Sequence, residues 1–521
     1  MTDRQRTAFA LSVLFAINAM NFFDRQILGA VTEPIRKEWG LSDGAMGALG
    51  TAFTLLYAAI GVPLGRLTDK RTRTRILSGG VFLWSLLTAA SGLARNYWQL
   101  FVLRLGVGVG EATCAPASTS LIGDLFPATK RARAMSIFMM GLPIGIALSF
   151  AVSSLIAQRY GWRPSFYVAG IPGLICTVAA LFIFEPKRGG TEAHDIGGQH
   201  RDEPPNRVMQ ELIFLVIGIV LVLAVYEILA VGAPRFLGID VGRTISGLVS
   251  LGCGAIYVAK RRRIVEGLRP FVLVLSIPTM WWIIASGALH NFNMYAIGSF
   301  LSPFLMRFHG VNIKDAGLIS MVVYGMAGVP GLLAGGIIGD SVMRRRQNGR
   351  LLVASVFLLV SVPLVFFALG AEKGNIALFM LLMGTGVGAT YAYYSTVYSS
   401  IHDIIEPASR GTAMALYFFA MYVLGASLGP VGTGLASDYF TRQAASAAGV
   451  LDLTREALEP FRAEGLHMAM YVIPVLGALL TIVLFAGSRT ITKDMDKLQR
   501  WMRESAKETA SVSAATTVSA K

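Results

Sequence analysis

The feature that most constrains this chain is a series of apolar blocks, each long enough to cross a bilayer. A helix needs about 20 residues to span ~30 Å of hydrocarbon. Six blocks precede the middle of the chain and six follow it, centred near Ile17, Leu55, Trp84, Gly110, Leu148, Leu174, Ile297, Gly325, Leu359, Gly386, Tyr422 and Leu476. Only 15% of the 521 residues are charged and 54% are hydrophobic, whereas a soluble chain needs more charge to cover its surface. The sequence therefore predicts an all-α integral membrane protein.

The middle of the chain differs from its flanks. A charged segment rich in Gly and Pro, 187–210, predicts a flexible cytoplasmic linker. Two further apolar blocks follow, Leu212–Val231 and Val241–Ala259, and predict an inserted transmembrane hairpin over 211–263, for about fourteen spans in total. Two amphipathic surface helices are the alternative for this pair. The remaining expected domains are an N-terminal six-helix bundle (1–186), a C-terminal six-helix bundle (264–490) and a partly disordered cytoplasmic tail (491–521).

The basic residues lie mainly in short connections between the apolar blocks. The net charge of +15 is concentrated in "DKRTRTR", "TKRARA", "EPKRGG", "KRRR" and "MRRRQNGR". A cytoplasmic start places all five on the cytoplasmic side, as the positive-inside rule requires. We therefore expect both termini in the cytoplasm, in the inner (plasma) membrane if the source is bacterial. The basicity sets orientation and does not indicate nucleic-acid binding.

Several enzyme classes are disfavoured by the reactive residues. The three cysteines, Cys114, Cys176 and Cys253, all lie within apolar blocks and have no disulfide or metal-ligand spacing. The six histidines show no ligand spacing, and neither GxSxG nor HExxH occurs. We expect no enzymatic activity and no metal. The first apolar block, 7–30, lacks a signal-peptide cleavage site and is expected to remain as the first helix.

The two halves of the chain repeat each other. "YAAIGVP" at 57–63 is echoed by "YGMAGVP" at 324–330. Further on, "GVGEATCAPASTSLIGDLFPATKRARAM" is echoed by "GVGATYAYYSTVYSSIHDIIEPASRGTAM". Parallel six-span repeats of this kind are typical of one large transporter architecture. The sequence thus favours a transporter.

Charged and amide side chains interrupt the first and fourth blocks. At 100° per residue, one face of the first helix, about 120° wide, carries Asn18, Asn21, Asp24 and Arg25. In the fourth block Arg104 and Glu111 are seven residues apart, on nearly the same stripe and about 10 Å apart along the axis. Charges inside a membrane are costly and normally face the bundle interior. We expect two carboxylates and two guanidiniums to converge there.

The second half carries weaker polar stripes. Ser286, His290 and Asn293 share one face of the seventh main block, and Tyr391 and Tyr394 share one face of the tenth. These five are candidates for lining a cavity. His290 could relay protons, although a simple hydrogen-bonding role is the plainer interpretation. Aromatic packing is equally compatible with the tyrosines.

These motifs resemble the major facilitator superfamily over nearly the whole chain apart from the inserted hairpin. "NFFDR", "RLGVGVGEA", "DLFPATKRARAMSIFMMGLPIG" and "GWRPSF" look most like its Spinster family of lipid transporters. Organic-anion:cation symporters share the Asp-Arg pair and the acidic residue of the fourth helix. The resemblance implies a major facilitator fold, two six-helix bundles plus the inserted hairpin.

The loop "GRLTDKRTRTR" resembles the superfamily's cytoplasmic gate motif, with Thr72 where Gly is usual. The resemblance implies gate roles, against ordinary anchoring charge as the alternative. The implied gate residues are Gly65, Asp69, Lys70, Arg73 and Arg75, with Gly336 and Asp340 in the second half.

The buried charges predict coupling to protons. A neighbouring Arg and burial act oppositely on a carboxylate, which can leave it poised to titrate. We favour Glu111 as the titrating group with Asp24 orienting Arg25, and leave the reverse open. Arg25, Arg104 and Asn21 are the candidates for binding a headgroup. A permanent ion-pair network between the two helices is the structural alternative.

The predicted function is a proton-coupled secondary transporter that works by alternating access. The resemblance implies a lysophospholipid- or sphingolipid-like substrate. An organic anion:proton symporter for small carboxylates or phosphates and a transport-inactive membrane sensor are the alternatives. We expect the proton as coupling ion, no other cofactor, and a monomer in the lipid bilayer.

Overall fold

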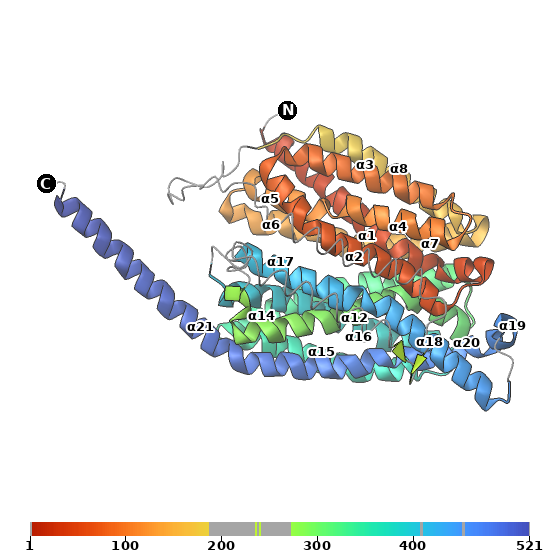
Figure 1. Ribbon diagram of the computed structural model, residues 1–521. Helices are drawn as coiled ribbons and strands as arrows, with labels where there is room; N and C mark the ends of the chain where they lie inside the picture. The colour runs from red at the N-terminus through yellow and green to blue at the C-terminus, as the bar shows by residue number, and fades with distance from the viewer. Residues whose placement is uncertain are drawn as a thin grey trace. The chain divides into compact units, whose positions relative to one another are not determined.

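The computed structural model describes residues 3–186, 235–236, 239–240, 272–406, 410–450 and 454–519. Helices account for nearly all the regular structure of these residues (Figure 1). The first half contains α1 (Asp3–Trp39), α2 (Asp43–Lys70), α3 (Arg73–Ser91), α4 (Tyr97–Glu111), α5 (Cys114–Leu125), α6 (Ala128–Met139), α7 (Gly141–Tyr160) and α8 (Arg163–Leu181).

The second half contains a matching series of helices, two of which are interrupted by a π-helical turn. Wider π turns shift the register of the side chains that follow and often occur at functional sites. They lie at Met321–Met326, between α13 and α14, and at Met421–Ala426, between α17 and α18. The helices are α12 (Pro278–Phe308), α13 (Ile313–Ser320), α14 (Gly328–Met343), α15 (Gly349–Leu369), α16 (Ile376–Ile404), α17 (Arg410–Ala420), α18 (Leu428–Ala447), α19 (Arg455–Leu458), α20 (Arg462–Met470) and α21 (Val472–Ser519), with a short 3-10 turn at Glu459–Phe461.

Local sequence explains several helix ends. Ser42 begins α2, where its hydroxyl accepts a hydrogen bond from the Ala45 N–H at 3.2 Å. Asn96 begins α4 in the same way through the Gln99 N–H at 3.0 Å. Such caps satisfy N–H groups that have no partner within the helix. Gly161 follows α7 with φ +78, a conformation that favours glycine.

Ten helical stretches of the described residues are long and apolar enough to cross a membrane. Helices α3 and α12, with 19 and 31 residues, pack among them. The two apolar blocks expected to form the inserted hairpin lie outside the described residues, as does the linker at 187–210. Within that region only a short antiparallel pair is described, β1 (Arg235–Phe236) with β2 (Ile239–Asp240). The tail expected at 491–521 continues α21 as a helix to Ser519.

The repeat predicted from sequence is visible in how the helices pack. In the first half α1 packs on α7, and α3 packs on α4 and α8; in the second half α12 packs on α21, and α15 packs on α16. Figure 1 shows α1–α8 lying side by side, and likewise α12–α21. Two contacts between the halves are related by the repeat, because α2 meets α18 while α7 meets α13. A third contact joins the two first helices, α1 and α12.

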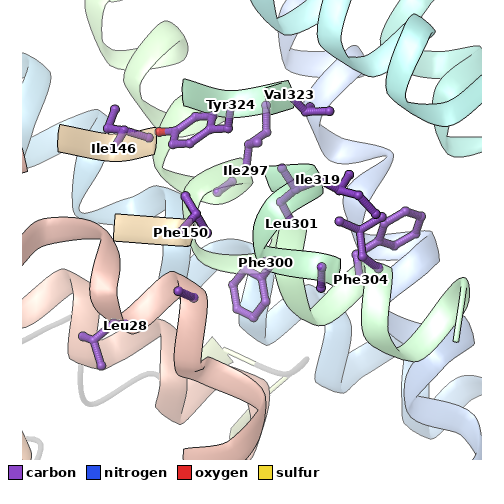
Figure 2. Close-up of a cluster of buried hydrophobic side chains, with 14 of the residues drawn as sticks. Leu28, Ile146, Phe150, Ile297, Phe300, Leu301, Phe304, Ile319, Val323 and Tyr324 are labelled. Atoms are coloured by element: carbon purple, nitrogen blue, oxygen red, sulfur yellow. The ribbon is translucent and has the colours of Figure 1, made fainter. Parts of the chain in front are cut away.

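A buried apolar cluster lies where the halves meet (Figure 2). The ring of Phe150 on α7 lies 6.1 Å from that of Tyr324, edge to face. Such packing favours a close, specific contact between helices. The labelled members are Leu28, Ile146, Phe150, Ile297, Phe300, Leu301, Phe304, Ile319, Val323 and Tyr324.

The contact between α1 and α12 depends on two glycines. A Cβ added at Gly29 would lie 2.0 Å from the carbonyl oxygen of Gly298, a backbone atom that cannot rotate away. We expect Gly29→Ala to destabilise the protein by about 1–3 kcal/mol, because overpacking forces the helices apart. A melting curve in detergent measures the effect. Gly79→Ala, whose Cβ would meet nothing within 4 Å, is the control, and equal melting temperatures for the two variants would contradict this account.

Candidate functional site

The charged residues of α1 and α4 meet, as the sequence predicts. Arg25 Nε donates to Glu111 Oε2 at 2.8 Å, and Asn21 Nδ2 donates to the same oxygen at 3.0 Å. Glu111 is the last residue of α4 and is 0% exposed. A buried carboxylate without a cationic partner would be strongly unfavourable. The ion pair therefore links the first and fourth spans of the first half.

Asp24 has different partners from those expected. Thr88 Oγ1 donates to Asp24 Oδ2 at 3.3 Å, while Oδ1 has no hydrogen-bond partner among the described residues. The residue that holds Arg25 is Glu111 instead. The reason is geometric, since neighbouring residues of a helix point about 100° apart and rarely share a partner. Asp24 faces α3, whereas Arg25 faces Glu111 on α4.

Arg25 also contacts tyrosines of the second half. Its Nη1 donates to the Tyr422 hydroxyl at 3.1 Å and to the Tyr295 hydroxyl at 3.5 Å. The guanidinium lies 4.3 Å from the ring centroid of Tyr57 on α2, within cation–π range. Sequence reasoning did not single out these tyrosines as site residues. For Tyr422 no periodic signal could have done so, because it lies in the π-helical turn at Met421–Ala426.

Arg104 is the most informative member of the cluster. It is 1% exposed, and its Nε and Nη1 have no hydrogen-bond partner among the described residues. Its Nη2 donates to the backbone carbonyl of Asp24 at 3.3 Å. A buried charged donor without an acceptor is costly. Such a group is expected where a ligand supplies the missing acceptor.

Arg104 and Arg25 line one cavity of about 30 Å³. This volume is enough for about one water molecule. The polar groups around it are mostly hydrogen-bond donors, whereas Asp24 and Glu111 are not part of its lining. A space lined by two guanidiniums suits an anionic group. Its polar lining comprises Arg25, Gln26, Thr32, Arg104, Tyr295 and Ser299.

The polar residues predicted for the second half lie away from this cavity. Ser286 Oγ bonds the Tyr393 hydroxyl at 2.8 Å, and His290 stacks on the Tyr393 ring at 4.0 Å between centroids. Asn293 Nδ2 donates to the Ile473 carbonyl at 3.1 Å. His290 and Asn293 line a separate cavity of about 20 Å³, where His290 Nε2 and Asn293 Oδ1 have no partner among the described residues.

Three other candidates serve packing within one half. The Tyr391 hydroxyl donates to the Tyr324 carbonyl at 2.8 Å. The Tyr394 ring lies edge-on to His290 at 4.8 Å. Asn18 Nδ2 donates to the Phe138 carbonyl at 2.8 Å and so ties α1 to α6. None of these three is among the residues that line the Arg25–Arg104 cavity.

The gate motif is partly described. Arg73 is buried, forms an ion pair with Asp124, and donates from Nε to Glu185 Oε1 at 2.8 Å. Burial raises the pKa of Glu185, but the Thr74 N–H and Arg73 outweigh it, so that the pKa lies below its ordinary value. Arg75 is exposed. The side chains at Asp69 and Lys70, and the position of Gly65, lie outside what the structure describes in detail.

The second half repeats this arrangement. Arg350 Nη2 lies 2.8 Å from Asp340, and its Nη1 lies 2.5 Å from Asp403. Arg350 begins the third helix of its half, as Arg73 does in the first. A Cβ at Gly336 would make only ordinary contact with Ser395. Sequence reasoning missed Arg350 and Asp403, although aligning the two halves at Arg73 would have found them.

Comparison with known proteins agrees with this architecture. A model of the Major Facilitator Superfamily matches residues 14–430. Protein spinster homolog 1 of Bos taurus is 27% identical over 481 residues, covering 91% of this chain and 79% of that protein. An MFS-type efflux pump of Mycolicibacterium smegmatis is 25% identical over 438 residues, covering 84% and 86%. The crystal structure of a bacterial homolog of the human lysosomal transporter Spinster, inward-facing and unoccupied, has a TM-score of 0.69 at 24% identity, covering 94% and 98%.

Proposed function

This chain belongs to the Major Facilitator Superfamily and is an integral membrane transporter that resembles Spinster, and from this premise we propose that it is a proton-coupled secondary transporter of an amphipathic, anionic, lipid-like substrate. The observation that carries the proposal is Arg104, a buried guanidinium with two donor atoms lacking acceptors beside a cavity shared with Arg25. An anionic headgroup supplies those acceptors.

The headgroup binds between the two guanidiniums. Carboxylates and phosphates accept paired hydrogen bonds from Arg. Arg104 offers Nε and Nη1, and Arg25 becomes available when it leaves the Tyr422 and Tyr295 hydroxyls. Asn21 has the different role of holding Glu111, because its amide already donates to that carboxylate.

The lipid-like character of the substrate rests on the resemblance to Spinster and on the apolar wall of the cavity. Leu28, Met46 and Phe300 line the same space as the guanidiniums. A cavity of about 30 Å³ does not hold an acyl chain, so the halves must move apart before substrate enters. Movement of this kind is what alternating access requires. A lysophospholipid or a sphingolipid is the substrate class we favour.

Proton coupling is assigned to Glu111. Glu111 Oε2 accepts from both Arg25 and Asn21, while Oε1 has no partner among the described residues. Protonation of Glu111 removes the charge that holds Arg25 and frees the guanidinium for the headgroup. Asp24, with Oδ1 also lacking a partner, is the second candidate. The proton is the only coupling ion proposed.

The arrangement in the membrane follows the positive-inside rule. We place both termini in the cytoplasm, in the inner membrane if the source is bacterial, with about fourteen spans that include the hairpin at 211–263. Asp340 and the residues around Arg73 then form the cytoplasmic gate. The transporter acts as a monomer.

The test is uptake into liposomes that contain the purified protein, driven by an imposed pH gradient. We expect uptake of a labelled lysophospholipid or sphingosine phosphate that collapses with the gradient. Uptake of a small carboxylate or phosphate instead would identify an organic anion:proton symporter, which the small volume of the cavity also suits. A ligand that raises the melting temperature but is never transported would identify a sensor.

A further inference from the structure

A buried ion-pair network joins the two halves where α1 ends and α2 begins. Arg307, near the end of α12, donates from Nε to Glu33 Oε2 at 2.7 Å. Its two terminal nitrogens donate to the two oxygens of Asp43, each at 2.8 Å. The side chain of Arg307 is 7% exposed, that of Glu33 2% and that of Asp43 0%. One arginine of the second half is thus clamped by two carboxylates of the first.

Two further contacts reinforce this clamp. Arg36 donates to both oxygens of Glu459, at 3.1 and 2.5 Å. Asp438 accepts the backbone N–H groups of Asp43 and Gly44, at 3.1 and 2.8 Å. A carboxylate of one half therefore caps the first turn of a helix in the other, where the helix dipole favours negative charge. We call these charged residues the latch: Glu33, Arg36, Asp43, Arg307, Asp438, Glu459 and Arg462.

The opposite end of α2 differs in character. Asp43 and Lys70, the two ends of α2, are separated by about 40 Å at 1.5 Å per residue. Near the Lys70 end Arg73 pairs with Asp124 and Glu185 of its own half. In the second half Arg350 pairs with Asp340 and Asp403 of its own half. Among the described side chains, ion pairs that join the halves thus gather at the latch end.

We infer that the latch is the second gate of the transporter, at the face opposite the cytoplasmic gate, and that Arg307 is its positioning residue. This inference rests on the proposed transport function. Because a buried charge that loses its partner is left uncompensated, the latch favours two states. Either all its pairs are closed and dry, or they are separated and surrounded by water. Intermediate openings are disfavoured.

The latch shares its helices with the substrate site. Arg25 and Glu33 both lie on α1, about 12 Å apart along the axis. Tyr295 and Arg307 both lie on α12, about 18 Å apart. The hydrogen bond from Arg25 to Tyr295 and the ion pair from Arg307 to Glu33 therefore join the same two helices at two levels. A headgroup that displaces Tyr295 from Arg25 removes one of these links and favours opening of the other.

The test measures whether the latch face opens, with a cysteine reporter at Thr433. Thr433 is buried on α18, and its hydroxyl has no partner among the described residues, so Thr433→Cys loses little. The native cysteines are replaced first. We expect a membrane-impermeant thiol reagent to label this reporter slowly in the parent protein. Labelling should be at least tenfold faster in the neutralised triple variant Glu33→Gln, Asp43→Asn, Arg307→Gln.

The triple variant is used because Arg307→Gln alone leaves two buried carboxylates without a cation and can fail to fold. Arg307→Lys, which keeps the charge, should restore most of the slow labelling. Arg163→Gln is the matched control, since Arg163 pairs with Glu38 of its own half at 2.7 Å, and it should leave labelling unchanged.

Equal labelling of the parent and of a triple variant that elutes and melts as a folded protein would overturn the inference. Accessibility is measured without substrate, so its result is independent of the proposed function. Faster labelling together with absent uptake would contradict the proposed function while leaving the latch in place. In a working transporter, net uptake should fall in the triple variant, since a gate that does not close cannot complete the cycle.

Discussion

Uptake by the Arg25→Ala variant is expected to fall at least about 100-fold, to the level of protein-free liposomes. Arg25 is the one side chain that contacts Glu111 of the first half and the Tyr422 and Tyr295 hydroxyls of the second. Alanine removes the cation that holds the headgroup in the proposed mechanism. The measurement is initial uptake into liposomes under a pH gradient, alongside the melting temperature of the purified variant.

Loss of folding must be separated from loss of binding, because breaking a buried ion pair costs about 3–5 kcal/mol. The double variant Arg25→Gln, Glu111→Gln leaves no uncompensated charge at this pair, and it should fold yet remain inactive. Arg25→Lys keeps the charge but loses the planar fork, so we expect it to be impaired as well. Arg159→Ala changes an exposed arginine near the end of α7 and serves as the control. Uptake by Arg25→Ala at the parent rate would remove this residue from the site.

The Glu111→Gln variant is expected to lose the dependence of uptake on the pH gradient. Glutamine keeps an oxygen that can accept from Arg25 and Asn21, but it cannot bind or release a proton in the working range. The carrier should then exchange internal for external substrate without accumulating it. Counterflow and gradient-driven uptake, measured on the same liposomes, separate these two activities.

Asp24→Asn is the matched comparison, because Asp24 is the other buried carboxylate of the cluster. If Glu111 carries the proton, Asp24→Asn should retain gradient-driven uptake, with weaker packing against Thr88. The reverse result, accumulation in Glu111→Gln and none in Asp24→Asn, would move the proton to Asp24. Accumulation in both single variants would leave the cluster as a permanent structural network.

The aligned repeats foretold much of the helix packing. Apolar block length and the 3.6-residue period are local properties, so the helices and the polar face of α1 could be read directly. The meeting of Arg25 with Glu111 also followed, since buried charges require partners and few were present in the first half. The pairing between neighbours was harder to assign. Asp24 and Arg25 are adjacent in the chain, yet only packed helices show that one faces Thr88 and the other Glu111.

The sequence by itself determined that this protein spans a membrane, is built from two related halves, and places acidic and guanidinium groups inside the first of them. Only the tertiary structure decided which surfaces of the halves touch. Arg307 and Glu33 are 274 residues apart, and Arg25 and Tyr422 are 397 apart. Contacts of this kind arise from the packing of whole helices against one another, and a π-helical turn at Tyr422 shifts even the local register. No spacing rule within one segment encodes them.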